Sequence, residues 1–408
     1  MPTRVVLLTQ WFDPEPTFKG LAFARELVRK GFAIEVVTGF PNYPGGRLYE
    51  GYRIRLIQRE VIDGVQITRL PLYPSHDGSA LRRILNYASF AASSLFYGLF
   101  MLKRPDVIYA YHPPLTVGIT ASLLRLIRRI PVVYDIQDMW PDTLRATGML
   151  NNEKLLAVVS RVCDWVYRQV DRIVVLSPGF KHLLLERGVP QEKLDLIYNW
   201  CDEAALHSAQ EFTRESPSSH QFRIVFAGNM GKAQALGTVI EAAELLSKEQ
   251  PDVCFLLVGS GVEVDRLKQL VAAKGLGNVV FVPRVPMKDV GAILGAADAL
   301  LVHLKDDPLF AITIPSKTQA YMAIGRPLLM AVRGDAADLV ERAGCGVMAS
   351  PEDARSVADA AIHLANMSAL ELETMGQRSR AFYERELSLA VGVERFSAHF
   401  RGLARRTA

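Results

Sequence analysis

The sequence predicts an α/β protein built from two doubly wound parallel sheets, each flanked by helices. Near the start, Arg4–Gly39 runs as an apolar strand, a loop containing glycine, an amphipathic helix and a second apolar strand. The same order recurs in the second half, over Phe222–Gly261. Strand–loop–helix–strand is the unit of a doubly wound sheet, and ligands bind beyond the carboxyl ends of its strands. Two such sheets facing one another across a cleft suit an enzyme that joins two substrates.

Length and composition agree with two domains in one chain. The 408 residues exceed one ordinary core and fit two domains of about 200 residues each, and half of them are hydrophobic. The four cysteines, Cys163, Cys201, Cys254 and Cys345, lie far apart without a CxxC pair, which predicts buried thiols in a reducing compartment. The first predicted strand, Arg4–Thr9, leaves no room for a signal peptide.

Short segments rich in valine and isoleucine alternate with helical patterns along the whole chain. The strands predicted in the first half are Arg4–Thr9, Ala33–Thr38, Val65–Leu70, Val107–Ala110, Val132–Asp135, Arg172–Leu176 and Leu194–Ile197. Those predicted in the second half are Arg223–Phe226, Cys254–Val258, Val279–Val282, Ala299–His303 and Pro327–Met330. The helices predicted there include Leu236–Lys248, Glu263–Lys274 and Asp353–Asn366.

These elements define the expected domains. The N-terminal domain covers residues 1–203, and residues 204–221 form a linker because they lack an apolar period and contain RESPSSH. The C-terminal domain covers residues 222–388. Residues 389–408 carry apolar side chains at helical spacing, so this helix either completes the second domain or crosses back to the first.

The positive charge of the chain is concentrated in one window. Between Arg82 and Arg129 there are seven basic residues and one acidic residue, so the remainder is slightly acidic. In the same window, fourteen of the nineteen residues of Ile84–Leu102 are apolar and none is charged. This segment (84–102) is either a helix buried on the first sheet or a helix partly exposed to lipid. We favour an anionic membrane surface over nucleic acid, because apolar and cationic features coincide and the aromatic residues lie among aliphatic ones.

A glycine-containing loop follows the first strand of the second half. It carries Gly228, Asn229, Lys232 and Gln234 and opens a helix. Backbone amides in such a loop bind phosphate, and Lys232 would add a positive charge. A single loop of this kind is more typical of a plain tight turn with glycines for steric reasons. A second such loop at the end of the next strand, with Gly259, favours phosphate binding.

A third segment at the same edge of the sheet contains Ser316 and Lys317. They precede a helix, whose free N–H groups would bind diphosphate. The alternative is a serine that caps the helix beside a solvated lysine. Because three loops converge on one edge, we expect a diphosphate there.

Polar residues also follow strands of the first half. Lys19 and Gly20 lie in the loop after the first strand, where they contact diphosphate or acceptor or serve only as loop residues. His112 ends the strand VIYAY, a position suited to proton transfer or to holding a sugar hydroxyl, although single histidines are usually structural.

The segment YDIQDMWPD ends a neighbouring strand. Asp138 and Asp142 are candidate bases or hydroxyl-binding groups, and Trp140 is a candidate sugar platform. A charged loop with helix caps is the alternative. The sequence contains no D-x-D and no cluster of histidine and cysteine ligands, so no metal held by the protein is expected. It contains neither GxSxG nor GxxxxGK[ST], which disfavours serine hydrolases and P-loop NTPases.

Together these segments resemble a known family, the retaining glycosyltransferases of the GT-B fold, family 4. Within it, the chain is similar to the bacterial surface-polysaccharide branch that includes fucosaminyltransferases. The segments that carry the resemblance lie in family order between residues 10 and 329: QWFDPEPTFKG, GFPNYPGG, YHPP, YDIQDMWPD, VLSPGF, IYNWCD, GNMGKAQAL, LVGSG and IPSKTQAYMAIGRPLL.

The resemblance implies two Rossmann-like domains, with an acceptor bound to the first and a UDP-sugar to the second, and no cofactor. It implies donor contacts from Asn229, Lys232, Gln234, Arg284, Ser316 and Lys317. The reacting centre would contain Gly20, His112 and Asp138. Lys19, Trp140 and Asp142, which the sequence itself selects, are the candidates for the acceptor side of the cleft.

The chain departs from the family in one place. The wider family has two glutamates eight positions apart, and Ile312 and Ala320 stand in their places here. The second glutamate holds the donor ribose, so Gln319 or a backbone group would have to replace it.

The function that the resemblance implies is transfer of a deoxyamino sugar, such as N-acetylfucosamine or another N-acetylhexosamine, from a UDP-sugar. The acceptor would be a polyprenyl-diphosphate-linked saccharide of O-antigen or capsule synthesis, at the cytoplasmic face of the inner membrane. Two alternatives remain open at this point: a UDP-sugar 2-epimerase, and a degenerate transferase that acts only as an assembly partner.

Overall fold

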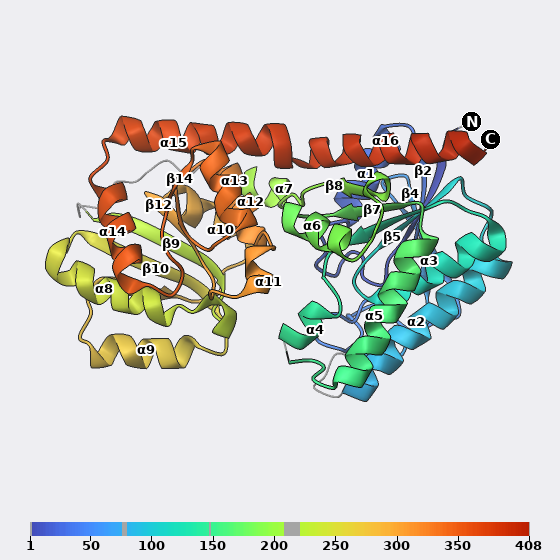
Figure 1. Cartoon of the computed structure of the whole chain (residues 1–408), viewed down its shortest axis with the longest axis horizontal. Helices are drawn as coiled ribbons and strands as arrows, with labels where there is room; N and C mark the ends of the chain where they lie inside the picture. Colours follow the sequence, from blue (N-terminus) through green and yellow to red (C-terminus); the bar gives the residue numbers. More distant parts are fainter. Residues whose placement is uncertain (1, 76–79, 147, 208–220, 408) are drawn as a thin grey trace. The chain divides into compact units, whose positions relative to one another are not determined.

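The computed structural model describes residues 2–75, 80–146, 148–207 and 221–407, and the chain divides into two compact units. Unit 1 consists of Met1–Tyr198 together with Gly392–Ala408, and unit 2 consists of Asn199–Val391. Each unit is an α/β domain with its own sheet (Figure 1). The end of the last helix therefore belongs to the same unit as the first strand.

Unit 1 is built on an eight-stranded sheet of order β3-β4-β2-β1-β5-β6-β7-β8. All neighbouring strands are parallel except β3 and β4. The strands are β1 (Arg4–Leu8), β2 (Ala33–Gly39), β3 (Gln58–Ile62), β4 (Val65–Leu70), β5 (Val107–Tyr111), β6 (Val132–Ile136), β7 (Arg172–Val175) and β8 (Leu194–Leu196). The strand order reverses between β1 and β5, so ligands are expected beyond the carboxyl ends of these two strands.

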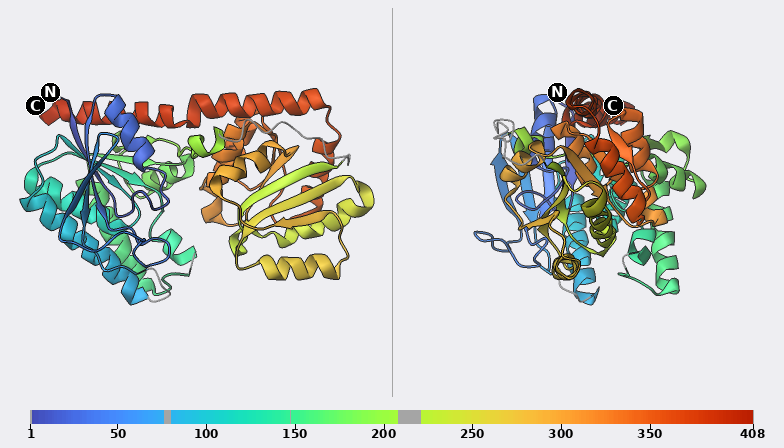
Figure 2. Two further views of the ribbon diagram at one scale, coloured as in Figure 1. Left: turned by 180° about the vertical axis from the view of Figure 1, so that it is seen from behind. Right: turned by 90° about the vertical axis from the view of Figure 1, so that its left-hand side faces the viewer.

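Helices cover both faces of this sheet, as Figures 1 and 2 show. One face carries α2 (Ala80–Phe100), α3 (Leu115–Arg128) and α5 (Glu153–Gln169), and the opposite face carries α1 (Leu21–Arg29) and α16 (Leu389–Thr407). Three shorter helices, α4 (Asp142–Ala146), α6 (Pro178–Glu186) and the 3₁₀ turn η1 (Gln191–Lys193), complete the unit.

The C-terminal helix α16 fills the interior of unit 1 with aromatic side chains. Phe396 and Phe400 are fully buried, and their rings lie 5.2 and 5.8 Å from the ring of Tyr109 on β5. Phe396 also contacts Phe23 of α1, at 5.3 Å between ring centroids. Of the two alternatives that the sequence left for this helix, the structure shows that it crosses back to the first domain.

Unit 2 is built on a six-stranded parallel sheet of order β11-β10-β9-β12-β13-β14. The strands are β9 (Phe222–Asn229), β10 (Val253–Ser260), β11 (Val279–Val282), β12 (Ala299–His303), β13 (Leu328–Ala331) and β14 (Gly346–Met348). Numbered within the unit, this is the Rossmann order, in which the direction of winding reverses between the first and fourth strands. That point lies between β9 and β12.

The helices of unit 2 alternate with its strands. They are α7 (Glu203–His207), η2 (Lys232–Gln234), α8 (Gly237–Glu249), α9 (Val264–Ala273), α10 (Met287–Gly295), α11 (Pro308–Ala311), α12 (Ser316–Ile324), α13 (Asp335–Ala343), α14 (Ala354–Ala365), α15 (Ala369–Phe382) and the π turn η3 (Tyr383–Leu387). Apolar residues of α8 and α14 pack on one side of the sheet and form a buried core with β9 and β10.

The structure confirms every predicted strand, with ends that move by a few residues, and adds two. The added strand β3 is a mostly solvated, polar edge strand, QREVI, which shows no alternation of apolar residues. The added strand β14 has only three residues. All four cysteines are buried free thiols, as predicted. The predicted linker begins within α7, and residues 208–220 lie outside the described residues.

None of the helices in the described part of the chain is both long enough and apolar enough to cross a membrane.

We predict that Phe396→Ala lowers the free energy of unfolding of unit 1 by about 3–5 kcal/mol, because it opens a cavity in a fully buried aromatic cluster. Leu370→Ala, at a position 73% exposed in α15, is the control and should change stability by less than about 0.5 kcal/mol. Urea unfolding followed by circular dichroism measures both. Equal stability of the two variants would show that α16 is not an integral part of the unit.

Candidate functional site

In unit 2, the carboxyl ends of β9 and β10 approach so closely that side chains do not fit between them. Gly228 and Gly259 have φ values of 143° and 139°, in a region that favours glycine. A Cβ atom on Gly259 would lie 2.0 Å from the carbonyl oxygen of Gly228, and one on Gly261 would lie 2.3 Å from that of Met230. Close packing of two loops thus explains Gly259 without a ligand, which is the alternative that the sequence left open.

Lys317 is the most unusual residue at this edge. It is the second residue of α12, and its side chain reaches back beneath β9, where Nζ lies 3.6 Å from the centroid of the Phe226 ring. Nζ is buried and has no hydrogen-bond partner. Burial lowers the pKa of Lys317 to about 7. A Cβ on Gly228 would lie 3.6 Å from Nζ, so the glycine loop covers the ammonium group directly.

His303 lies close to Lys317 at the end of β12, and the sequence analysis did not select it. Its Nδ1 lies 2.8 Å from the carbonyl oxygen of Gln234, which requires Nδ1–H to donate. Burial lowers the pKa of His303, with a smaller contribution from the charge of Lys317, so the neutral ring leaves Nε2 as an acceptor. Nε2 is buried without a partner. Two unsatisfied polar groups therefore flank the switch point between β9 and β12.

Two further side chains hold this arrangement in place. The hydroxyl of Tyr321, a buried residue of α12, accepts a hydrogen bond of 2.8 Å from the backbone N–H of Ala227 and thereby ties α12 to the end of β9. The side-chain oxygen of Gln234 accepts a hydrogen bond of 2.9 Å from the N–H of Gly231 and closes the glycine loop. Gln234 thus shapes the loop, where the sequence predicted a donor contact.

The remaining candidates in unit 2 fall into two groups. Asn229, Lys232, Arg284 and Ser316 are exposed at the carboxyl ends of their strands or at the start of α12, where they are free to meet a ligand. Gln319, in contrast, is buried, and its amide is oriented to donate to the carbonyl oxygens of Pro315 and Ser316. Gln319 is therefore not placed to replace the glutamate missing at Ala320.

In unit 1, the loop between β1 and α1 is closed by a carboxylate. Asp13 Oδ2 accepts a hydrogen bond of 2.6 Å from the N–H of Leu21, the first residue of α1. A Cβ on Gly20 would lie 2.2 Å from the same oxygen. Gly20 therefore makes room for Asp13, which occupies the helix N-terminus where an anionic ligand would otherwise bind.

Lys19 lies in the interior of unit 1, although the sequence placed it beside the acceptor. It is 2% exposed, and Nζ lies 5.3 Å from the Phe396 ring centroid. Burial lowers its pKa to about 8, and the charge of buried Asp135 opposes that shift. Asp135 accepts hydrogen bonds of 2.6 Å from Tyr109 and from Gln137. Lys19 and Asp135 thus form a buried structural pair below the loop.

His112 follows β5 and is held at the carboxyl edge of the sheet. The backbone N–H of His112 donates to the carbonyl oxygen of Asp135 at 3.0 Å. The imidazole ring meets the rings of Tyr134 and Trp140 edge-on, at 5.9 and 5.6 Å between centroids. Burial lowers the pKa of His112 to about 3, so the imidazole is neutral near pH 7. Its Nδ1 is buried without a partner. The ring can therefore exchange a hydrogen bond with a hydroxyl group.

Asp138 follows β6 at the same edge. Burial raises the pKa of its carboxyl group, which suits a group that accepts a proton or holds a hydroxyl. Burial raises the pKa values of Tyr43 and Tyr87, the charge of Asp138 adds to both shifts, and Arg83 opposes the shift of Tyr87. These residues of the β2 loop and of α2 lie near the carboxylate; Tyr43 is part of the GFPNYPGG segment, whereas Arg83 and Tyr87 belong to no segment of the resemblance.

Asp142 and Trp140 have structural contacts in unit 1. Asp142 opens α4 and pairs with Arg187, which also donates to the carbonyl oxygen of Trp140 at 3.3 Å. Asp142 is therefore already neutralised. Trp140 keeps its contact with His112 and remains beside the candidate reacting groups.

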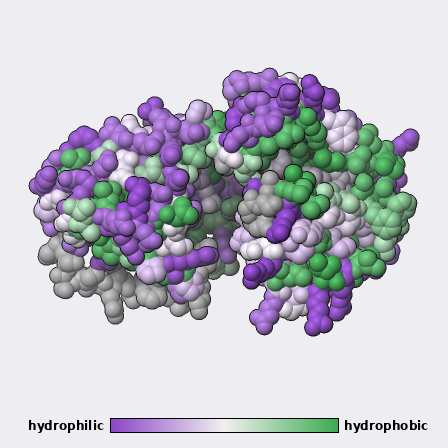
Figure 3. All heavy atoms as spheres, turned by 90° about the horizontal axis from the view of Figure 1, so that it is seen from below, coloured by the Kyte–Doolittle hydropathy of each residue, from purple (hydrophilic) through white to green (hydrophobic). Residues whose placement is uncertain are grey.

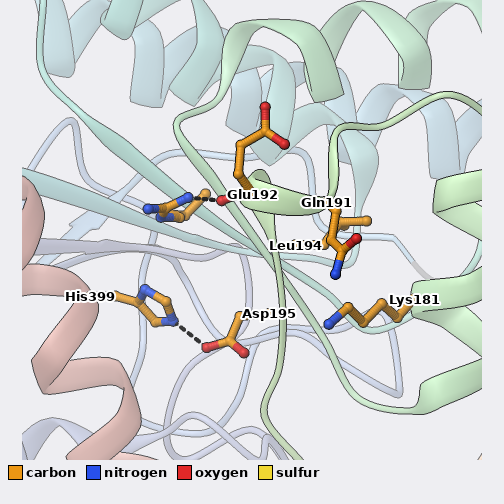
Figure 4. Close-up of a pocket in the computed structure, with 7 residues that line it drawn as sticks. Lys181, Gln191, Glu192, Leu194, Asp195 and His399 are labelled. Atoms are coloured by element: carbon orange, nitrogen blue, oxygen red, sulfur yellow. Dashed lines mark hydrogen bonds and ion pairs between the residues drawn. The ribbon is translucent and has the colours of Figure 1, made fainter.

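A pocket of unit 1 lies away from these residues. It has a volume of about 600 Å³ and is lined by Arg172, Lys181, Asp195 and His399 among others (Figure 4). Arg172 and Leu194 open β7 and β8, so this pocket is at the amino ends of the strands. His399 Nε2 and Asp195 Oδ2 are 2.6 Å apart, and this hydrogen bond holds α16 against β8. Within the described ranges, no group of three or more histidine, cysteine, aspartate or glutamate side chains is placed to hold a metal ion.

Comparison with known proteins assigns the chain to a class. Residues 21–200 match the family described as "Glycosyl transferase 4-like domain", and residues 221–367 match "Glycosyl transferases group 1". Two Rossmann-like domains with these two family matches define a glycosyltransferase of the GT-B fold. The chain belongs to the family-4-like glycosyltransferases.

Individual relatives agree with this assignment. The putative colanic acid biosynthesis glycosyl transferase WcaI of Escherichia coli (strain K12) is 29% identical over 311 residues, 73% of this chain and 75% of the relative. The probable glycosyltransferase WbjE of Pseudomonas aeruginosa is 24% identical over 308 residues, 74% of this chain and 76% of the relative. Among solved structures, Anabaena Alr3699/HepE in complex with UDP-glucose has a TM-score of 0.67 at 16% identity and covers 98% of this chain and 99% of its own.

We predict that Gly259→Ala destabilises unit 2 by more than about 2 kcal/mol, because the new methyl group meets the Gly228 carbonyl and the backbone favours glycine. Gly277→Ala is the matched control, since a Cβ there has no atom within 4 Å. Thermal unfolding measures both. A melting temperature of Gly259→Ala as high as that of Gly277→Ala would contradict the close approach of β9 and β10.

Proposed function

We propose that this glycosyltransferase moves an N-acetylhexosamine or deoxyamino sugar, such as N-acetylfucosamine, from a UDP-sugar to a polyprenyl-diphosphate-linked saccharide during surface-polysaccharide synthesis. The observation that supports the donor site is the ammonium group of Lys317, which is buried without a hydrogen-bond partner beneath the Gly228 loop. The names of WcaI and of HepE in complex with UDP-glucose support polysaccharide synthesis and a UDP-sugar, respectively.

The donor diphosphate is assigned to the edge formed by β9, β12 and α12. A lysine side chain without a hydrogen-bond partner in an apolar surrounding loses hydration that an anion would replace. The N-terminus of α12, with exposed Ser316, adds free backbone donors on the same side. Positive charge at this point stabilises the diphosphate as it leaves the sugar, which is the main requirement of a reaction through an oxocarbenium-like centre.

The acceptor is assigned to the edge of unit 1 that carries His112 and Asp138. A neutral imidazole with a free ring nitrogen and a carboxylate of raised pKa are suited to orient a hydroxyl group and to receive its proton. In a retaining reaction the hydroxyl attacks on the face from which the UDP leaves, and the departing diphosphate shares the proton. The sugar keeps its anomeric configuration in that case.

Two measurements test this function in sequence. Thermal unfolding with UDP-, GDP- and dTDP-sugars identifies the nucleotide, because a ligand that binds the folded state raises the melting temperature. Incubation of the selected radiolabelled sugar donor with lipid-linked saccharides then detects transfer. Conversion of the UDP-sugar without an acceptor would replace the proposal by an epimerase, and binding without any transfer would replace it by a non-catalytic partner.

We predict that the affinity for UDP-glucose is constant below pH 7 and falls up to about tenfold per pH unit above it. Lys317, with a pKa of about 7 in the free protein, must be protonated to bind diphosphate, and bound diphosphate raises that pKa. Calorimetry over this pH range measures the effect. UDP-glucose is the ligand for this measurement because the terminal phosphate of UDP itself titrates at about pH 6.

The control for this prediction is Lys317→Met, which keeps the length of the side chain without its charge. Affinity at pH 6 should fall by about tenfold to a hundredfold, and the pH dependence should disappear. An unchanged pH profile in the methionine variant would move the diphosphate away from Lys317.

We also predict that His112→Ala lowers the rate of sugar transfer by about a hundredfold or more and changes donor affinity by less than about twofold. His182→Ala, at an exposed position of α6, is the control and should leave both unchanged. Single-turnover transfer gives the rate, and calorimetry gives the affinity. A normal rate in His112→Ala would remove this ring from the reacting centre.

A further inference from the structure

Helix α2 turns an apolar face toward the solvent. From Ile84 to Phe100, every exposed residue is apolar: Ile84, Leu85, Ala88, Ala92, Phe96 and Phe100. The buried side of the same helix contains two polar residues, Asn86 and Ser94, beside Phe90 and Tyr97. Helices of water-soluble domains normally turn the polar side outward. The outward face of α2 is therefore suited to an apolar partner.

This apolar face extends beyond α2. Met101 after the helix, and Leu126 and Ile127 at the end of α3, are also exposed, and α3 packs along α2. Figure 3 shows hydrophobic side chains gathered on the surface of unit 1. We call these residues the docking face: Leu81, Ile84, Leu85, Phe96, Phe100, Met101, Leu126 and Ile127. Contiguous apolar surfaces of this kind mark sites of association.

Basic residues lie at both ends of the docking face. Arg82 and Arg83 are at the start of α2, Lys103 and Arg104 follow its end, and Arg129 follows α3. The long window from Arg82 to Arg129 contains one acidic residue. An apolar strip with cations at its ends complements the acyl chains and the anionic head groups of a bilayer. A protein partner or second copy of the chain would need matching acidic groups at both ends.

The start of α2 is fixed to the candidate acceptor edge. Asn86 Oδ1 accepts from Gln10 Nε2 at 2.5 Å, and Asn86 Nδ2 donates to the carbonyl oxygen of Tyr73 at 2.7 Å and to Asn42 Oδ1 at 3.3 Å. Gln10 and Asn42 follow β1 and β2 at the carboxyl edge of the sheet. The helix is about 31 Å long at 1.5 Å per residue, so it forms a rigid strip that begins at the carboxyl edge of the sheet, the edge that carries His112 and Asp138.

We infer that the docking face binds an anionic lipid bilayer with α2 lying along its surface, which brings the acceptor edge of unit 1 next to the membrane. The inference rests on the proposed function, since a lipid-linked acceptor is held in that membrane. Phe96 and Phe100, whose ring centroids are 5.1 Å apart, would enter the boundary between head groups and acyl chains.

Sedimentation of the full chain with vesicles tests the docking face. Vesicles of equal parts phosphatidylcholine and phosphatidylglycerol should bind the protein, and vesicles of phosphatidylcholine alone should bind it much more weakly. Phe96→Ser with Phe100→Ser, and separately Lys103→Glu with Arg104→Glu, should each weaken binding by about tenfold or more. Leu370→Ser with Val262→Ser, at exposed apolar positions of unit 2, is the matched control and should bind like the wild type.

Two readouts separate the possible failures. The circular dichroism spectrum and the affinity for UDP-glucose should be unchanged in all variants, because the donor site belongs to unit 2. Loss of vesicle binding with intact nucleotide binding therefore supports the docking face. Wild-type protein that does not bind anionic vesicles, or serine variants that bind them equally well, would overturn the inference even if sugar transfer is observed. Sedimentation velocity showing a dimer that the serine variants dissociate would assign the face to a second copy of the chain instead.

Discussion

The organisation of unit 2 depends on an ammonium group that the fold removes from water without giving it a hydrogen-bond partner. Lys317 lies against the Phe226 ring, below a loop in which Gly228 has no side chain to obstruct it. Such an arrangement is unfavourable in the free protein and lowers the pKa of the amine. It becomes favourable when an anion arrives. The register of β9 with β10, the hydrogen bond from Ala227 to Tyr321 and the closed Gln234 loop all hold this one charge in position.

In unit 1, by contrast, charged groups are compensated by partners of opposite charge. Lys19 is compensated by Asp135, Asp142 by Arg187, and the start of α1 by Asp13. Among the described residues of the carboxyl edge, His112 Nδ1 keeps unsatisfied hydrogen-bonding capacity, and burial raises the pKa of Asp138 at the same edge. The chemistry available there is a hydrogen bond to a hydroxyl group, whereas unit 2 offers a positive charge. The two edges therefore suit a neutral acceptor group and an anionic donor respectively.

The fold was predictable because parallel strands that are buried on both faces have continuous apolar sequences, as β5, β6 and β9 do. The position of Lys317 at the start of a helix was also predictable, since it follows from the Ile-Pro-Ser-Lys segment. His303 was missed because a histidine inside a buried strand carries no motif, and its role depends on the carbonyl of Gln234. Lys19 was misplaced because loop residues are expected at the surface, and its burial depends on α16, almost four hundred residues later. Packing between residues so far apart in the chain leaves no local signal in the sequence.

The return of α16 to unit 1 determines the order in which the chain can mature during synthesis. Phe396 and Phe400 fill the space beside Phe23 and Tyr109, so the first domain to leave the ribosome stays incomplete until the final helix is released. Unit 2 is contiguous from Asn199 to Val391 and can close first. A multidomain protein ordinarily folds from its N-terminus; here unit 1 keeps an open aromatic groove until α16 is synthesised, so we expect a chain truncated before Gly392 to form unit 2 alone.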